Sequence, residues 1–159
     1  MNKAVYIIGG IVVLLIAGWF LTRGSASVSG VDVDNNLDGS TTYSNEEGSV
    51  TVGTTATMPS NWPSDAPANF AGATIVYSGT SNPQTGKTGS AVSYTARASV
   101  QAVADYYKQQ LTAAGWTIAG TANIAGATVV SATKDTRTFG AYISDTGDGN
   151  VSVTAGIEL

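Results

Sequence analysis

One stretch of the sequence decides what kind of domain this chain forms: residues 99–116 read SVQAVADYYKQQLTAAGW. Its apolar residues return at steps of three and four, the spacing of one apolar stripe along a helix. Ser99 is a suitable N-cap residue, and Gly115 stands where a left-handed C-terminal cap is expected. The stretch predicts an amphipathic helix over about 99–114, with this stripe: Val100, Val103, Ala104, Tyr107, Leu111 and Ala114.

The segments on both sides of this helix alternate with the period of two that is typical of β-strands. Two strands are expected before the helix, and an antiparallel meander after it. One helical stripe covers one face of a sheet, so the pattern predicts a two-layer α+β domain over residues 58–159, ordered β-β-α-β-β-β-β. The expected strands are 73–78, 90–96, 116–118, 128–133, 139–143 and 151–157.

Residues 24–57 are rich in Gly, Ser, Thr and Asp, a composition typical of a linker. Within them, residues 41–52 contain two β-prone runs around a turn that ends in Gly48, which indicates a β-hairpin. An isolated hairpin is marginal in water, so this one is expected to pack on the domain that follows. Three prolines at 59–67 stiffen the approach to that domain.

Residues 4–22 are uncharged and mostly apolar, and Lys3 and Arg23 bound them. As a helix, nineteen residues would cover about 28 Å, close to the thickness of a bilayer core. We therefore predict a transmembrane anchor at 1–23 that contacts the lipid bilayer through residues 4–22. The alternative is a cleaved signal peptide with processing near Ser27, although the apolar cores of such peptides are usually shorter.

The short N-terminal tail before the apolar segment favours a cytoplasmic N-terminus and an extracytoplasmic domain. The predicted location is the cell membrane, crossed once, with the domain at the cell surface. Few charges determine this orientation: Lys3 and the terminal amine precede the apolar segment, and Arg23 follows it.

Composition excludes several classes of function. The 159-residue chain has no His and no Cys, so it lacks the commonest general base and the usual zinc and iron–sulfur ligands. Its net charge of -4 opposes nucleic-acid binding, which needs a basic surface. We therefore expect no enzymatic activity, no cofactor and no nucleic-acid partner.

One acidic stretch resembles the first half of a calcium loop. Asp34, Asn36 and Asp38 alternate before Gly39, and Glu46 stands one residue beyond the position of the usual bidentate acid. These four residues are the candidate calcium ligands. The competing interpretation is a turn in which Asx side chains bond their own backbone.

Two aromatic residues are candidates for a contact surface. Tyr106 and Tyr107 are adjacent on the predicted helix, so only one of them can face the sheet. We assign that position to Tyr107, which leaves Tyr106 exposed. Together with Trp62, Tyr106 could contact a sugar or peptide, because aromatic side chains offer both apolar area and a polar edge.

Several motifs along the chain occur together: the run 45–53, Met58-Pro59, the run 62–67, Tyr106-Tyr107-Lys108 with Leu111, and Gly115-Trp116. With these motifs the chain resembles a group of uncharacterised bacterial membrane-anchored extracytoplasmic proteins. The resemblance spans nearly the whole chain and implies no activity, since that family has none assigned.

The function expected from these features is a membrane-anchored, non-enzymatic binding or interaction module, whose partner is an envelope polymer or a protein. Two alternatives stay open. One is a pilin-like structural subunit of a surface filament, although Gly24 and Gly30 would end its helix early. The other is a small catalytic domain, for which the sequence supplies no set of nucleophile and base.

Overall fold

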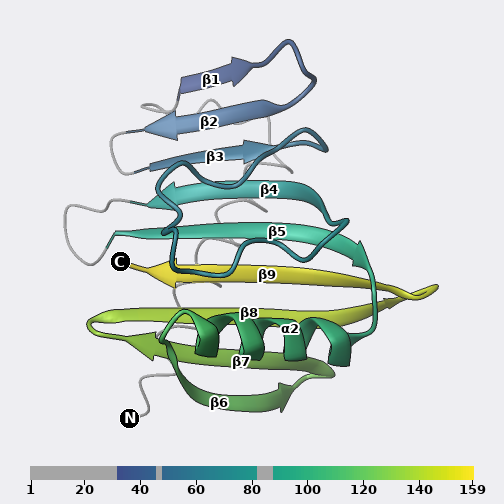
Figure 1. Cartoon of the computed structure of the whole chain (residues 1–159). Coiled ribbons are helices and arrows are strands. Elements are labelled where there is room, and N and C mark those ends of the chain that lie inside the picture. Colours follow the sequence, from purple (N-terminus) through teal and green to yellow (C-terminus); the bar gives the residue numbers. More distant parts are fainter. Residues whose placement is uncertain (1–31, 46–47, 82–87) are drawn as a thin grey trace.

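The computed structural model describes residues 32–45, 48–81 and 88–159. These residues form one antiparallel nine-stranded sheet and one α-helix, α2 (Figure 1). The strands are β1 (Asp32–Asn35), β2 (Thr41–Asn45), β3 (Gly48–Val52), β4 (Thr74–Ser81), β5 (Gly89–Arg97), β6 (Thr117–Ile124), β7 (Ala127–Lys134), β8 (Arg137–Gly147) and β9 (Asn150–Glu158).

The order of strands in the sheet is β1-β2-β3-β4-β5-β9-β8-β7-β6. The chain builds one half of the sheet from β1 to β5, crosses through α2, and builds the other half from its far edge back to the centre. The C-terminal strand β9 therefore lies between β5 and β8 and joins the two halves (Figure 1). Strands β1 and β6 are the two edges.

Helix α2 (Val100–Ala113) has the limits and the orientation that the apolar stripe predicts. The Ser99 side chain accepts a hydrogen bond from the Ala102 N–H, which confirms the N-cap. Gly115 has φ +80°, the left-handed conformation expected just beyond the helix. Tyr107 is buried against the sheet, as assigned from the sequence.

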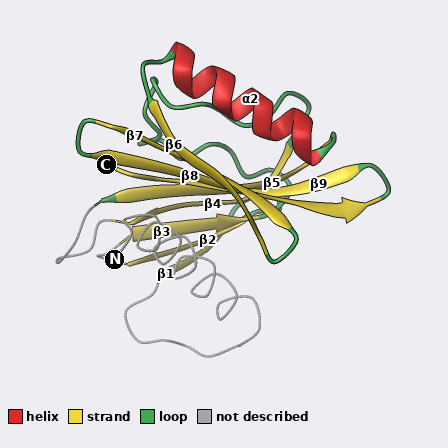
Figure 2. Ribbon diagram, turned by 90° about the horizontal axis from the view of Figure 1, so that it is seen from below, coloured by secondary structure: helices red, strands yellow, loops and turns green. Residues whose placement is uncertain are grey.

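The core lies between the sheet and α2, on what we call the helix face of the sheet (Figure 2). The helix packs over β6, β7 and β8. The connection 53–73 passes over β4, β5 and β9 and covers the rest of the core (Figure 1). The largest buried side chains include Tyr94, Tyr107, Leu111, Phe139 and Ile143.

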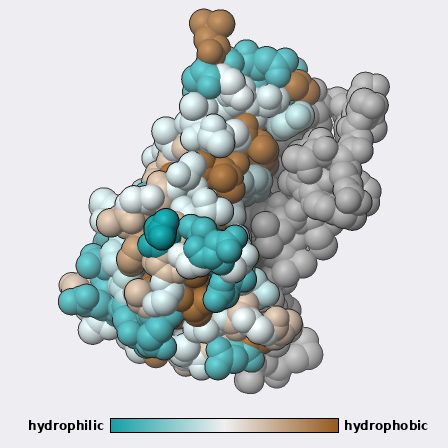
Figure 3. All heavy atoms as spheres, turned by 90° about the vertical axis from the view of Figure 1, so that its right-hand side faces the viewer, coloured by the Kyte–Doolittle hydropathy of each residue, from teal (hydrophilic) through white to brown (hydrophobic). Residues whose placement is uncertain are grey.

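The β1–β2, β6–β7 and β8–β9 turns lie at the same end of the sheet (Figure 1). The space-filling view of this end is polar over most of its area, with separate apolar patches (Figure 3). Leu37, in the β1–β2 turn, is fully exposed.

The predicted α+β fold class with a transmembrane helix is wrong, because the described chain is predominantly β. Strands β2 and β3 form the hairpin expected at 41–52, and together with β1 they extend the main sheet instead of belonging to a linker. The single helix covers only part of one face. The physical reason is that Ser and Thr side chains pair across these strands: the Thr42 and Thr51 hydroxyls are 2.9 Å apart.

Apart from the gaps named above, residues 32–159 hold no helix with the length and hydrophobicity that a membrane span requires. Residues 4–22, where we predicted the anchor, lie outside the described residues.

Candidate functional site

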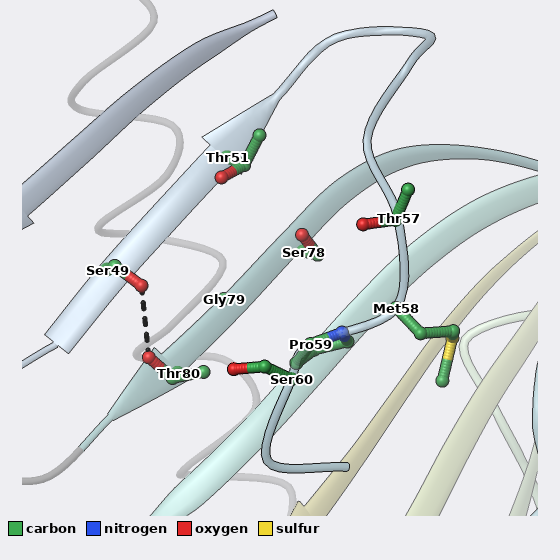
Figure 4. A pocket seen from close by; sticks show the side chains of 9 residues that line it. All are labelled: Ser49, Thr51, Thr57, Met58, Pro59, Ser60, Ser78, Gly79 and Thr80. Atoms are coloured by element: carbon green, nitrogen blue, oxygen red, sulfur yellow. Dashed lines mark hydrogen bonds between the residues drawn. The ribbon is translucent and has the colours of Figure 1, made fainter. Parts of the chain in front are cut away.

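A shallow hollow of about 210 Å³ lies between residues 57–60 and strands β3 and β4 (Figure 4). It opens on the helix face of the sheet, beyond the end of the apolar core. Six of its nine lining residues carry a hydroxyl group. The lining residues are Ser49, Thr51, Thr57, Met58, Pro59, Ser60, Ser78, Gly79 and Thr80.

The strand register brings these hydroxyls together. Thr51 is opposite Ser78, and Ser49 is opposite Thr80, on neighbouring strands. Ser78 in turn is opposite Val92 of β5, which belongs to the core, so the hydroxyl rows and the core share the helix face. The floor of the hollow is therefore a polar continuation of the surface that binds α2 elsewhere.

Three of the six hydroxyls take part in two separate sets of side-chain hydrogen bonds. The Ser49 and Thr80 hydroxyl oxygens are 3.1 Å apart, a bond drawn in Figure 4. The Thr51 hydroxyl bonds that of Thr42, which also accepts a hydrogen bond from Asn36 Nδ2. Each hydroxyl has one donor and two acceptor positions, so these bonds leave capacity for a ligand.

Gly53 directs the chain from β3 across the sheet to form the wall of the hollow. Its φ is +144°, and a Cβ atom there would lie 2.9 Å from Ser40 Cα. The Gly53 N–H donates to the Val76 carbonyl, and the Ala56 N–H donates back to the Gly53 carbonyl. Only glycine fits this turn without a shift of the backbone.

Asp65 fixes the other end of the crossing connection. Its carboxylate accepts a bidentate pair of hydrogen bonds from Arg137 at 2.8 and 2.7 Å, and one from Lys134 Nζ at 2.7 Å. The Asp65 carbonyl accepts from Trp116 Nε1, and the Arg137 guanidinium lies 5.0 Å from the Trp116 ring centre. Lys134 also donates to the Ala114 carbonyl at the end of α2.

This network determines the ionisation of Asp65. Hydrogen bonds from Arg137, and then from Lys134, hold the pKa of Asp65 well below its usual range. The carboxylate therefore stays charged and ties residues 59–67 to β7, β8 and the helix end. Its role is structural, and no local sequence pattern indicates it, because the partners lie 69 and 72 residues away.

The candidate calcium ligands lie in and around the β1–β2 turn. Asp38 Oδ1 accepts from the Ser40 N–H at 2.9 Å and from the Ser40 hydroxyl at 2.8 Å, and these bonds hold the Asp38 pKa below its usual range. Asn36 Nδ2 donates to the Ser40 hydroxyl. Asp34 is exposed on β1.

Glu46 lies outside the described residues. Among the described residues, no three acidic, His or Cys side chains are grouped so that they could hold a metal ion. The calcium site stays a prediction, and the observed bonds are those of the Asx turn that competes with it.

The two candidate contact aromatics are half-buried and packed against the domain. The Tyr106 ring lies edge-on to Phe70, with centroids 5.3 Å apart, and its hydroxyl donates to the Ala68 carbonyl at 3.3 Å. Trp62 donates from Nε1 to the Pro67 carbonyl and lies edge-on to Phe139. Neither lines the hollow, although the Trp62 backbone N–H donates to the carbonyl of Pro59, which does. The expected exposure of Tyr106 is not observed.

A comparison with protein families finds one match. Residues 76–154 match the family model described as START domain-like. This family is uncharacterised. The resemblance expected from the sequence is therefore confirmed only as a likeness to an uncharacterised family, and over a shorter part of the chain. Membrane anchoring is not confirmed. No curated protein and no solved structure is significantly similar to the chain.

The limits of the match divide the hollow. The matched region includes most of β4, the helix and most of the buried core residues. Ser78, Gly79 and Thr80 lie inside it, while β3 and residues 57–60 lie outside. The hollow therefore forms where the matched unit meets the preceding strands.

Proposed function

We propose that this chain is a non-enzymatic binding module that takes a neutral, hydroxyl-rich polymer of the cell envelope in the hollow between β3, β4 and residues 57–60. The observation that carries the proposal is the set of six hydroxyl side chains with no charged side chain among the lining residues.

The chemistry of the lining favours this class of ligand. Hydroxyl groups donate and accept hydrogen bonds, so they match a ligand whose own hydroxyls do both. A charged ligand would need compensating charges, which the lining does not offer. At about 210 Å³ the hollow is smaller than most small-molecule sites, which suits one unit of a longer polymer.

The proposal also includes the location of the module. The uncharged segment 4–22, bounded by Lys3 and Arg23, would keep the chain at the cell membrane with the domain outside the cytoplasm. Protease treatment of intact cells tests this: the domain is expected to be degraded in unbroken cells. Survival of the domain until the cells are lysed would overturn the location.

The binding proposal is tested with full-length protein in mild detergent on immobilised polysaccharides of three kinds: neutral, anionic and cationic. Binding is expected only to neutral polymers and should be insensitive to salt, because no ion pair contributes. Hydrolysis of any of these polymers, or a preference for a charged one, would contradict the proposal.

A further inference from the structure

The edge strand β6 lacks the features that normally protect the edge of a sheet. It reads TIAGTANI, with neither charge nor proline, and residues 121–124 are all exposed. Natural edges are usually blunted by charged residues, prolines or short length, because an open edge pairs with other strands. The opposite edge, β1, is only four residues long and carries Asp32 and Asp34.

The turn beside β6 shows which of its backbone groups are available. Ala125 and Gly126 both have positive φ, 51° and 85°, as in the two-residue turn of a tight hairpin. The flanking pair Ile124 and Ala127 then exchanges hydrogen bonds, and bonding alternates along the strand. The N–H and C=O groups of Thr121 and Asn123 therefore point away from β7.

An apolar patch accompanies this edge on the sheet face opposite α2. Ala122, Val129 and Tyr142 are direct neighbours across β6, β7 and β8, and Ile124 follows two residues along from Ala122. Ile124 is 41% exposed and Tyr142 is 37% exposed, two of the few large apolar side chains open to solvent in the described chain. An open edge and an apolar patch at the same place indicate an interaction surface.

We propose that β6 pairs antiparallel with β6 of a second copy of this chain, so that the two sheets become continuous. The geometry sets the register. The backbone N–H and C=O groups of Thr121 and Asn123 point outward. Thr121 of each copy therefore exchanges hydrogen bonds with Asn123 of the other, and the two-fold axis of the pair passes by Ala122.

This register is sterically self-complementary. Ala122 lies opposite Ala122 of the second copy, and Ile124 lies opposite Gly120, where no side chain obstructs it. The bulge between Ile118 and Gly120 ends the regular strand and limits pairing to residues 120–124. The absence of charge removes the like-charge repulsion that would oppose self-pairing at β1.

The interface is small, so the dimer is expected to be weak, and covalent trapping is the suitable measurement. The chain has no Cys, which allows single cysteines to be introduced without background. Full-length Ala122→Cys in its native membranes is expected to form a disulfide-linked dimer on mild oxidation, because directly opposed residues have Cβ atoms about 4.5–5.5 Å apart.

Thr121→Cys is the matched control, at another exposed position on the same strand, but opposite Asn123 of the second copy rather than opposite itself. Its dimer yield is expected to be at least about five-fold lower than that of Ala122→Cys, given the diagonal separation of about 7–8 Å. Co-expression of Thr121→Cys with Asn123→Cys should restore the yield.

Equal crosslinking of Ala122→Cys and Thr121→Cys would mean random collision and would overturn the proposal. So would a lack of crosslinking by Ala122→Cys, or crosslinking to a different protein, which would show that another strand occupies the edge. The hollow is formed by β3 and β4, so none of these outcomes bears on polymer binding.

Discussion

The two halves of the helix face of the sheet share the same antiparallel backbone, but one half carries apolar side chains and the other carries hydroxyl side chains. From β5 to β7 this face carries Tyr94, Val153, Phe139 and Val130, which α2 and residues 53–73 cover. From β2 to β4 it carries Thr42, Thr51 and Ser78 in one row. The core ends where hydroxyls replace apolar side chains.

This difference shows how one sheet can serve two purposes. Apolar rows need a cover and supply stability through burial. Hydroxyl rows bond one another across the strands and need no cover, so they leave a surface that can bind. If this division is correct, substitutions in the core half should reduce stability, and those in the hydroxyl half should reduce binding.

The largest effect is expected for Phe139→Ala in the core half. Phe139 is fully buried, and its ring packs against Tyr107, Trp116 and Trp62. Its removal should lower the free energy of unfolding by about 3–5 kcal/mol, measured by denaturant titration. Val33→Ala, at an exposed position on β1, is the control and should change it by less than about 0.5 kcal/mol. Similar losses from both would contradict the division.

A smaller loss is expected for Tyr94→Phe, which removes one member of a buried hydroxyl pair. The Tyr94 and Tyr107 hydroxyls are 2.7 Å apart, and burial raises the pKa of Tyr94 to about 12, so the pair stays neutral. The substitution leaves the Tyr107 hydroxyl without this partner and should cost about 1–3 kcal/mol. A Tyr94→Phe/Tyr107→Phe double variant should lose less than the sum of the single variants.

Asp65→Asn tests the network that fixes the crossing connection. The pKa of Asp65 is lower in the folded state than in the unfolded state. Asp65 therefore contributes to the free energy of unfolding above about pH 4, the ordinary carboxyl range, and this contribution is lost as the pH falls towards the folded-state pKa. The variant should lose about 1 kcal/mol at pH 7, since Asp65 is partly screened by solvent. The free energy of unfolding should therefore depend less on pH in the variant than in the wild type. Denaturant titrations over roughly pH 2–7, the range in which carboxyl groups titrate, measure this.

An unchanged pH dependence in that variant would show that Asp65 does not stabilise the fold. Asp105→Asn is the control, because Asp105 pairs with Lys108 on the exposed side of α2. This surface pair should contribute little.

The smallest stability effect is expected for Thr51→Val in the hydroxyl half. Thr51 loses its bond to Thr42, but both side chains are half-exposed and water can replace the partner. The cost should be below about 1 kcal/mol, measured by the same denaturant titration. A loss as large as that of Phe139→Ala would mean that the hydroxyl rows are part of the core.

The sequence predicts the local elements around the core well, because periodicity reports directly on which face is buried. Helix α2, its Ser99 cap and the burial of Tyr107 follow from a spacing of three and four residues. The β-prone runs at 41–52 predict the β2–β3 hairpin. Strand β1 and the pairing of this hairpin with β4 were not predicted, because the composition of residues 24–57 is that of a linker.

The hollow and the Asp65 network could not be predicted, since both depend on long-range contacts. Asp65 is 69 and 72 positions from its two cationic partners, and nothing local indicates the pairing. The hollow requires residues 57–60 to fold back beside β4, opposite β3. Gly53 is the one local signal, as an isolated glycine at the end of a strand marks a turn.

The most direct test of the account is the affinity of full-length protein for a neutral polysaccharide, compared among wild type, Thr51→Val/Thr80→Val and Thr95→Val. Thr95 is an exposed threonine on β5 outside the hollow, so its substitution removes a hydroxyl without touching the site. We expect wild type and Thr95→Val to bind equally and the double variant to bind at least about ten-fold more weakly, or about 1.4 kcal/mol. Equal binding by all three proteins would contradict the division between a core half and a binding half.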